Sequence, residues 1–260
     1  MIGLAVRGIG VLAPGLPGWP SARRVLAGET PYQASEVAEP RPDALPPNER
    51  RRGVRTVRWA IAAAQEALAA SGAAPADSVS VFATSSGDGE TLVQILEGLV
   101  QPAREVSPTR FHNSVHNAGS GYWSIAAGAR RAAVTLCGYD ASFAAALLEA
   151  AALVHAGERP VLLVTYDVPY PPPLLAARPI LEPLALALVL DAEGAAPALA
   201  RWRVTLEARP ATIAAMPIPA LASNPAARAV PLLAAAAGAE AAEVRLGLPG
   251  GSTLLVGAHP

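Results

Sequence analysis

The segment from 117 to 157 constrains the fold of this chain more than any other part of the sequence. It begins with a glycine-rich turn and a short helix, continues as a buried strand, turns sharply at Gly138 to Asp140, and ends in an alanine-rich helix. Many α/β enzymes mount a nucleophile at such a corner, because the corner lifts one side chain beside unpaired N–H groups of the helix. Here the corner carries an aspartate.

Strands and helices alternate along most of the chain. The predicted strands lie at 2–13, 78–84, 132–136, 161–165, 184–190, 202–207 and 252–256, and the predicted helices at 21–27, 48–71, 90–100, 141–156 and 225–237. Because helices connect the first four strands, we expect an α/β fold with a mostly parallel sheet that is covered by helices on both faces. The proline-rich segment 169–183 predicts a long loop.

Composition limits the possible functions. A formal charge of −1 gives no general attraction to nucleic acid, and no uncharged apolar run reaches 18 residues, so no membrane span is expected. The first residues lack the basic segment of a secretion signal, and the single Cys137 fits a reducing compartment, so we expect a cytoplasmic protein. All 20 basic residues are arginine, which excludes lysine chemistry within this chain.

Three stretches resemble the β-ketoacyl synthase family, in the family's order. The first stretch contains Val6 to Gly15, Trp19, residues 26–28, and Arg50 to Arg52 ahead of a helix that ends at 69–72. The second is SPTRFHNSVHNAGSGYWSIAAGAR, and the third is GERPVLLVT. The resemblance covers residues 1–207 and implies a thiolase-like layered fold, which is normally built from two pseudo-repeated halves. It divides the chain into a ketosynthase-like N-terminal half, 1–207, and an abbreviated C-terminal remnant, 208–260, packed on the same domain.

The resemblance also implies which residue stands where the family has its catalytic cysteine. Asp140 lies 23 residues after Asn117 and 17 before Gly157, which are the family's spacings. Cys137 lies 20 residues from each and would need compensating gaps on both sides. We therefore assign Asp140 to the nucleophile position. The alternative, in which Cys137 is the active cysteine, stays open; otherwise Cys137 is expected to be a small buried strand residue.

The family's other catalytic groups, two histidines and a lysine, have no evident counterparts here. The chain has no lysine, and after His155 its only histidine is His259. His112 and His116 lie before the corner, outside the family's catalytic positions, and are expected to be surface or interface residues rather than metal ligands. We expect no cofactor and no metal.

This pattern resembles the chain-length-factor class, catalytically silent subunits that pair with an active ketosynthase and help to shape its acyl tunnel. A carboxylate at the nucleophile position would form only a labile mixed anhydride, so no stable acyl-enzyme is expected. The resemblance is greatest to the compact subunit of aryl polyene and related type II fatty-acid-like pathways. Two alternatives stay open: an independent acyl-thioester transferase or decarboxylase that uses Cys137 or Asp140, and a homodimeric structural or regulatory ketosynthase-like protein.

A partner is also expected from hydropathy. The mean hydropathy is +0.32 with 16% charged residues, which leaves more apolar side chains than a monomer of this size hides easily. The resemblance implies that the strand before the corner pairs with the partner across a two-fold axis, and that 109–123 lies beside the partner's tunnel. The candidate tunnel and interface residues are Phe111, Asn117, Tyr122, Trp123, Ala132, Ala133, Val134, Thr135 and Leu136.

Two of these assignments have ordinary alternatives. Phe111, Tyr122 and Trp123 would be tunnel stops, or else aromatic residues that pack inside the chain. The arginines between 50 and 58 could meet an acidic acyl carrier protein, or they could simply be the solvated start of a helix.

Overall fold

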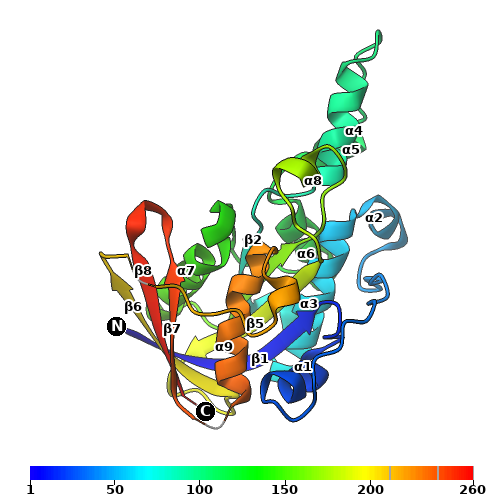
Figure 1. Ribbon diagram of the computed structural model, residues 1–260. Helices are drawn as coiled ribbons and strands as arrows, with labels where there is room; N and C mark the ends of the chain where they lie inside the picture. Colours follow the sequence, from blue (N-terminus) through cyan, green and yellow to red (C-terminus); the bar gives the residue numbers. More distant parts are fainter. Residues whose placement is uncertain (211, 239, 260) are drawn as a thin grey trace.

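A computed structural model describes residues 1–210, 212–238 and 240–259 of the chain. Within these residues the strands form one eight-stranded sheet in the order β3-β2-β4-β5-β1-β6-β8-β7 (Figure 1). The strands are β1 (Ile2–Leu12), β2 (Val79–Ala83), β3 (Ala133–Leu136), β4 (Val161–Asp167), β5 (Leu184–Ala192), β6 (Ala200–Glu207), β7 (Ala242–Gly247) and β8 (Thr253–His259). The predicted α/β architecture is confirmed.

The prediction of a mostly parallel sheet is wrong. Only β2 pairs in parallel, with β3 and β4, while the pairings β4–β5, β5–β1, β1–β6, β6–β8 and β8–β7 are antiparallel. The physical reason lies in the connections. The loop after β4 returns to the end of the sheet at which β4 finishes, and a strand that is reached without a crossover must run antiparallel. Helical connections therefore lead to parallel pairing only among β2, β3 and β4.

Helices cover both faces of the sheet, as predicted. Helices α3 and α6 pack on one face against Phe82, Val164 and Val189, and helices α1, α7 and α9 pack on the other. The helices are α1 (Trp19–Leu26), α2 (Pro47–Arg52), α3 (Arg55–Ser71), α4 (Gly89–Leu99), α5 (Pro108–Ser114), α6 (Ala118–Ala127), α7 (Ser142–His155), α8 (Leu174–Ala177) and α9 (Val230–Ala237). Each face therefore has its own apolar core.

The approach of α3 to β1 depends on two glycines in the strand. A Cβ atom at Gly8 would lie 2.0 Å from the carbonyl oxygen of Ala67, and one at Gly10 would lie 2.1 Å from that of Ala63. Real Cβ atoms do not come so close to a backbone oxygen. Glycine at these two positions lets the helix backbone lie directly on the strand.

The predicted helix over 48–71 is two helices, α2 and α3, separated at Gly53 and Val54. Helices α4 and α5 then form an arm that extends away from the body of the molecule (Figure 1). Strand β7 was not predicted, and the proline-rich loop contains the short helix α8. Among the described residues, no helix has the length and apolar character needed to cross a membrane.

Candidate functional site

The corner between β3 and α7 has the sharp backbone that the sequence predicts. Tyr139 has φ +54°, a left-handed conformation that costs a non-glycine residue about 1–2 kcal/mol. The side chain of Ser142, in the first turn of α7, holds the corner from inside. Its Oγ accepts a hydrogen bond from the N–H of Gly138 at 3.0 Å and lies 2.8 Å from the carbonyl oxygen of Tyr139. The strained residue is thus Tyr139, directly before Asp140.

Asp140 stands at this corner, and an arginine from the proline-rich loop neutralises it. Arg178 Nη2 donates to Asp140 Oδ1 at 2.7 Å, and its guanidinium carbon lies 3.6 Å from the ring centroid of Tyr139. The Asp140 side chain is 52% exposed and that of Arg178 only 17%. The carboxylate of Asp140 is therefore held in an ion pair with Arg178. The assignment of Asp140 to the family's nucleophile position stays a prediction.

Cys137 follows β3 directly and is exposed, so the expectation of a buried strand residue is wrong. The strand ends at Leu136, one residue before the cysteine, and within the described part of the chain it lies at the edge of the sheet with β2 as its only neighbour. Partial burial of the thiol, together with the negative charge of Asp167, raises the pKa of Cys137 above its ordinary value. A raised pKa reduces the thiolate fraction, which is the opposite of what a catalytic cysteine needs.

Asp167 is a buried carboxyl group behind the corner. It is 1% exposed, and its Oδ1 accepts hydrogen bonds from Thr84 Oγ1, Ser85 N and Ser85 Oγ, each at 2.9 Å. Its Oδ2 has no hydrogen-bond partner among the described residues. Burial raises the pKa of Asp167 to about 6, although the hydrogen bonds from Ser85 and Thr84 oppose this effect. Asp167 thus fixes the start of the loop that leads into α4.

Sequence reasoning missed Asp167 and Arg178. Asp167 follows an apolar strand directly, at the C-terminal end where α/β folds often carry functional side chains, and this position is a usable signal. Arg178 lies in an irregular loop, and no local pattern relates it to the corner 38 residues earlier.

The two predicted histidines lie away from the corner, in and after α5. The imidazole of His112 makes an edge-on contact with the ring of Tyr122, with 5.7 Å between the centroids. No group of three or more potential metal-ligating side chains occurs in the part of the chain that the structure describes. His112 and His116 are both exposed, as expected for surface or interface residues.

The structure separates the three aromatic tunnel candidates. Tyr122 and Trp123 are buried in the core between α6 and the sheet, at 1% and 2% exposure, and Tyr122 Oη donates to Asn113 Oδ1 at 3.0 Å. Phe111 on α5 is 66% exposed. Asn117 is also exposed and begins α6. Of the three aromatic side chains, only that of Phe111 is free to reach a partner.

Strand β3, which contains four of the five strand candidates, is at the end of the sheet and pairs only with β2 in the described chain. The carbonyl oxygens of Ala132 and Leu136 accept hydrogen bonds from the N–H groups of Ser80 in β2 and of Thr84, which follows β2. Because successive residues of a strand direct their N–H and C=O groups to opposite sides, Ala133 and Thr135 present theirs to the open edge. This edge could accept another strand.

Three of the arginines between 50 and 58, at the end of α2 and the start of α3, form ion pairs within the chain. Arg50 binds Asp43 at 2.8 Å, and Arg55 Nε binds Glu39 at 2.5 Å. Arg52 lies 3.4 Å from Glu49. These carboxylates reduce the positive field that the sequence alone would predict here, and the geometry favours a solvated helix start over a strongly basic docking surface.

Known structures of ketosynthase complexes have the same fold as this chain. It aligns over 99% of its length with 100% of one chain from the complex of the ketosynthase ApeO with its chain length factor ApeC from Xenorhabdus doucetiae, at 23% identity and a TM-score of 0.72. It aligns over 98% with 99% of a chain of the ishigamide ketosynthase/chain length factor, at 14% identity and a TM-score of 0.73.

A third alignment, over 99% of each chain at 11% identity and a TM-score of 0.77, is with AntDE:AntF, a type II acyl-carrier protein in complex with its ketosynthase bound to the hexaketide. These likenesses confirm the thiolase-like fold. No curated protein matches the sequence. The family profile described as "Beta-ketoacyl synthase, N-terminal domain" matches residues 26–235, most of the chain. The chain therefore belongs to the family defined by the β-ketoacyl synthase N-terminal domain.

Proposed function

We propose that this chain is a catalytically silent, chain-length-factor-type subunit, which pairs with an active β-ketoacyl synthase and shapes its acyl tunnel. The biosynthesis would be of the polyene or fatty-acid-like kind, in the cytoplasm. One observation carries the proposal: the corner at which the resemblance places the family's nucleophile presents an aspartate, which is ion-paired with Arg178 at 2.7 Å. The neighbouring Cys137 has a raised pKa, and the chain contains no lysine to assist it.

The open edge of β3 supports pairing with another subunit. Its outward N–H and C=O groups lie beside half-buried Val134, Thr135 and Leu136, and Ile125 on the neighbouring α6 is 47% exposed. Two of the structural relatives come from complexes of a ketosynthase with a chain length factor. A β-strand of the ketosynthase added at this edge would cover both the polar groups and the apolar side chains.

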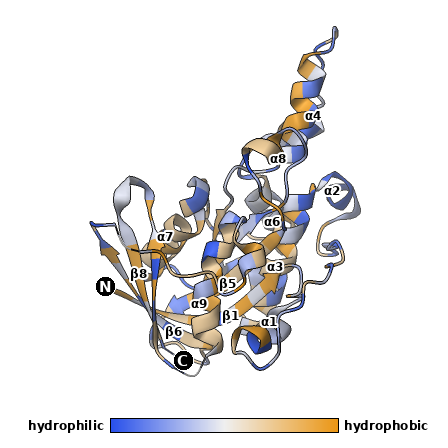
Figure 2. Cartoon of the chain, viewed as in Figure 1, coloured by the Kyte–Doolittle hydropathy of each residue, from blue (hydrophilic) through white to orange (hydrophobic). Residues whose placement is uncertain are grey.

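The arm formed by α4 and α5 supports a role at the acyl tunnel. Leu92, Leu96 and Leu99 follow one another at helical spacing on α4 and are 43%, 50% and 43% exposed. Figure 2 shows hydrophobic residues in α4 along this arm. Such a row of leucines is typical of a helix face that is covered in an assembly. Phe111 extends from the same arm, so we propose that this side chain reaches the partner and limits the depth of its tunnel.

Residues 1–207 would then be the ketosynthase-like half, and 208–260 an abbreviated second part on the same domain. This division is supported by β8, which pairs with β6 over seven residue positions from Arg201 to Glu207 and so continues the same sheet. An acyl carrier protein would approach the assembled pair, as AntF is described with its ketosynthase. We assign no docking surface for it to this chain.

The proposal is tested by reconstituting the chain with a ketosynthase encoded next to it, together with carrier-bound acyl and malonyl substrates. We expect product only from the pair, activity within about twofold for the Asp140→Ala and Cys137→Ser variants, and longer products with Phe111→Ala. A Leu181→Ala variant, at another exposed apolar residue, should leave product length unchanged and serves as the control. Turnover by this chain alone, abolished by either corner variant, would establish an independent enzyme instead.

A further inference from the structure

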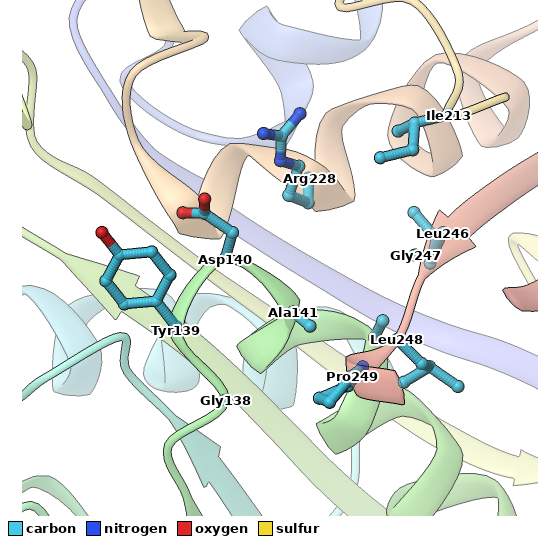
Figure 3. Close-up of a pocket in the computed structure, with 11 residues that line it drawn as sticks. Gly138, Tyr139, Asp140, Ala141, Ile213, Arg228, Leu246, Gly247, Leu248 and Pro249 are labelled. Atoms are coloured by element: carbon cyan, nitrogen blue, oxygen red, sulfur yellow. The ribbon is translucent and has the colours of Figure 1, made fainter. Parts of the chain in front are cut away.

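A pocket of about 370 Å³ lies beside the corner, on the side of α7 (Figure 3). The corner and the first turn of α7 form one wall, and the end of β7 with the turn into β8 forms the opposite wall. Its main lining residues are Asp140, Ala144, Ile213, Arg228, Leu246 and Leu248. The volume is within the range of pockets that bind small molecules.

The chemistry of the lining is that of a site for a short aliphatic chain. Ala144, Leu246 and Leu248 supply methyl and methylene groups. Ile213 lines the same pocket and lies above Leu246 in the view of Figure 3. Gly247 adds no side chain, although a Cβ at this position would make only ordinary contact, 3.5 Å from Ile213 Cδ1. The absence of a side chain at Gly247 keeps this space open, and burial of a ligand's alkyl chain here would displace water from apolar walls.

Arg228 gives the pocket a specific polar group. It is half-buried, and among the described residues it forms no hydrogen bond or ion pair, whereas Arg178 across the corner is paired with Asp140. The turn that carries Arg228 is firmly anchored. Asn224 Nδ2 donates to the carbonyl oxygens of Asp167 at 2.9 Å and Glu182 at 2.8 Å. A guanidinium held at the wall of an apolar pocket is a ready partner for a carboxylate.

We propose that this pocket reversibly binds an aliphatic carboxylate, with its head group on Arg228 and its alkyl chain between Ala144, Ile213 and Leu246. The carboxylate of Asp140 also lines the pocket, but its pairing with Arg178 reduces the repulsion of a second anion. No bond forms or breaks in this step. The pocket would thus hold a ligand without a covalent step at the corner.

The test is calorimetric titration of the purified full chain with three probes: octanoate, octan-1-ol and acetate. We expect saturable binding of octanoate, weaker binding of the alcohol, and no measurable binding of acetate. The Arg228→Gln variant should bind octanoate about tenfold or more weakly, because a hydrogen bond to a charged group is lost, and should leave the alcohol unaffected. The Gly247→Val variant should weaken both ligands by filling the pocket. Arg159→Gln, at an exposed arginine before β4, is the control.

Equal affinity for octanoate and octan-1-ol in the wild-type chain would overturn the proposal, and so would unchanged octanoate binding in Arg228→Gln or in Gly247→Val. If Arg228→Gln fails to fold, the Gly247→Val variant and the comparison of the two wild-type affinities still decide the matter. The pairing with a ketosynthase is measured separately. A chain that does not bind octanoate can still have the proposed function, and a chain that does not pair with a ketosynthase can still bind octanoate in this pocket.

Discussion

Asp167 allows a quantitative test of the buried cluster behind the corner. Its carboxyl is 1% exposed, and burial raises its pKa from 3.8 to about 6. For an acid, a folded-state pKa above the unfolded value means that the folded chain binds the proton more tightly. The resulting contribution to stability is fully present below about pH 3.8 and is lost as the pH rises through about 6. This group therefore makes the chain less stable at neutral pH than at mildly acidic pH.

The magnitude follows from the shift of about 2 pH units, the difference between about 6 and 3.8. At 1.36 kcal/mol per unit, the full loss is about 3 kcal/mol, and between about pH 5 and about pH 7.5 it is roughly 1.4 kcal/mol. The substitution Asp167→Asn removes the titration while its Oδ1 can still accept the hydrogen bonds from Thr84 and Ser85. The variant should not show this part of the pH dependence.

The assay is urea unfolding of the wild-type chain and of Asp167→Asn at these two pH values. The free energy of unfolding of the wild type should fall by roughly 1.4 kcal/mol relative to the variant as the pH rises. Asp77→Asn, at an exposed aspartate, controls for the loss of one negative charge. Parallel pH profiles for wild type and Asp167→Asn would show instead that this carboxyl has the same pKa in the folded and unfolded chains.

Two further predictions concern β1 and the corner. Gly10→Ala should lower the free energy of unfolding by about 1–3 kcal/mol in thermal or urea unfolding, because its Cβ would lie 2.1 Å from the carbonyl oxygen of Ala63. Gly121→Ala, on the exposed face of α6 with nothing within 4 Å, should instead raise it by about 0.5–1 kcal/mol, and equal effects of the two would contradict the packing argument. Iodoacetamide should modify Cys137 more slowly at neutral pH than an unstructured cysteine peptide, and faster after Asp167→Asn, because the negative charge of Asp167 contributes to the raised pKa of the thiol. Rapid alkylation of the wild type would show a reactive thiolate at the corner.

The sequence predicted the elements around the corner closely. The strand expected at 132–136 is Ala133–Leu136, and the helix expected at 141–156 is Ser142–His155. These segments carry their own signals: a short β-branched run, a glycine at the corner, and a long run of alanine and leucine. The length of α7 and the sharpness of the turn are local properties, so local reasoning was sufficient.

Strand directions were less accessible, because the hydrophobic pattern of a strand does not specify its neighbour. The buried run Leu184–Ala192 is equally compatible with parallel and antiparallel pairing. Strand β7 does alternate, with Val244 and Leu246 buried and Glu243 exposed, but six residues with an alanine and a glycine at the ends give a weak signal. The direction of β5 and the presence of β7 therefore depended on tertiary information.

The candidate site shows the same division. The sequence pattern placed Asp140 at the corner, where the structure has it, and its assignment to the family's nucleophile position stays a prediction. The partners of this corner could not be predicted, because Arg178 and Arg228 come from an irregular loop and a short 3-10 turn that only the folded chain brings near. The predictions for Tyr122 and Cys137 depended on burial, which the local pattern does not specify. Tyr122 is enclosed in the core, and Cys137 is exposed beyond the end of a short edge strand.

The proposed function requires the open edge of β3 to join this chain to a ketosynthase. Light scattering during size-exclusion chromatography of the co-expressed and co-purified chains measures this pairing. We predict a particle with one copy of each chain, which Ala133→Pro disrupts by removing an N–H group at the open edge and which Ala133→Ser preserves. Both variants should unfold at nearly the same temperature as the wild type. A chain that elutes without the ketosynthase, or a complex unaffected by Ala133→Pro, would contradict pairing through the edge of β3.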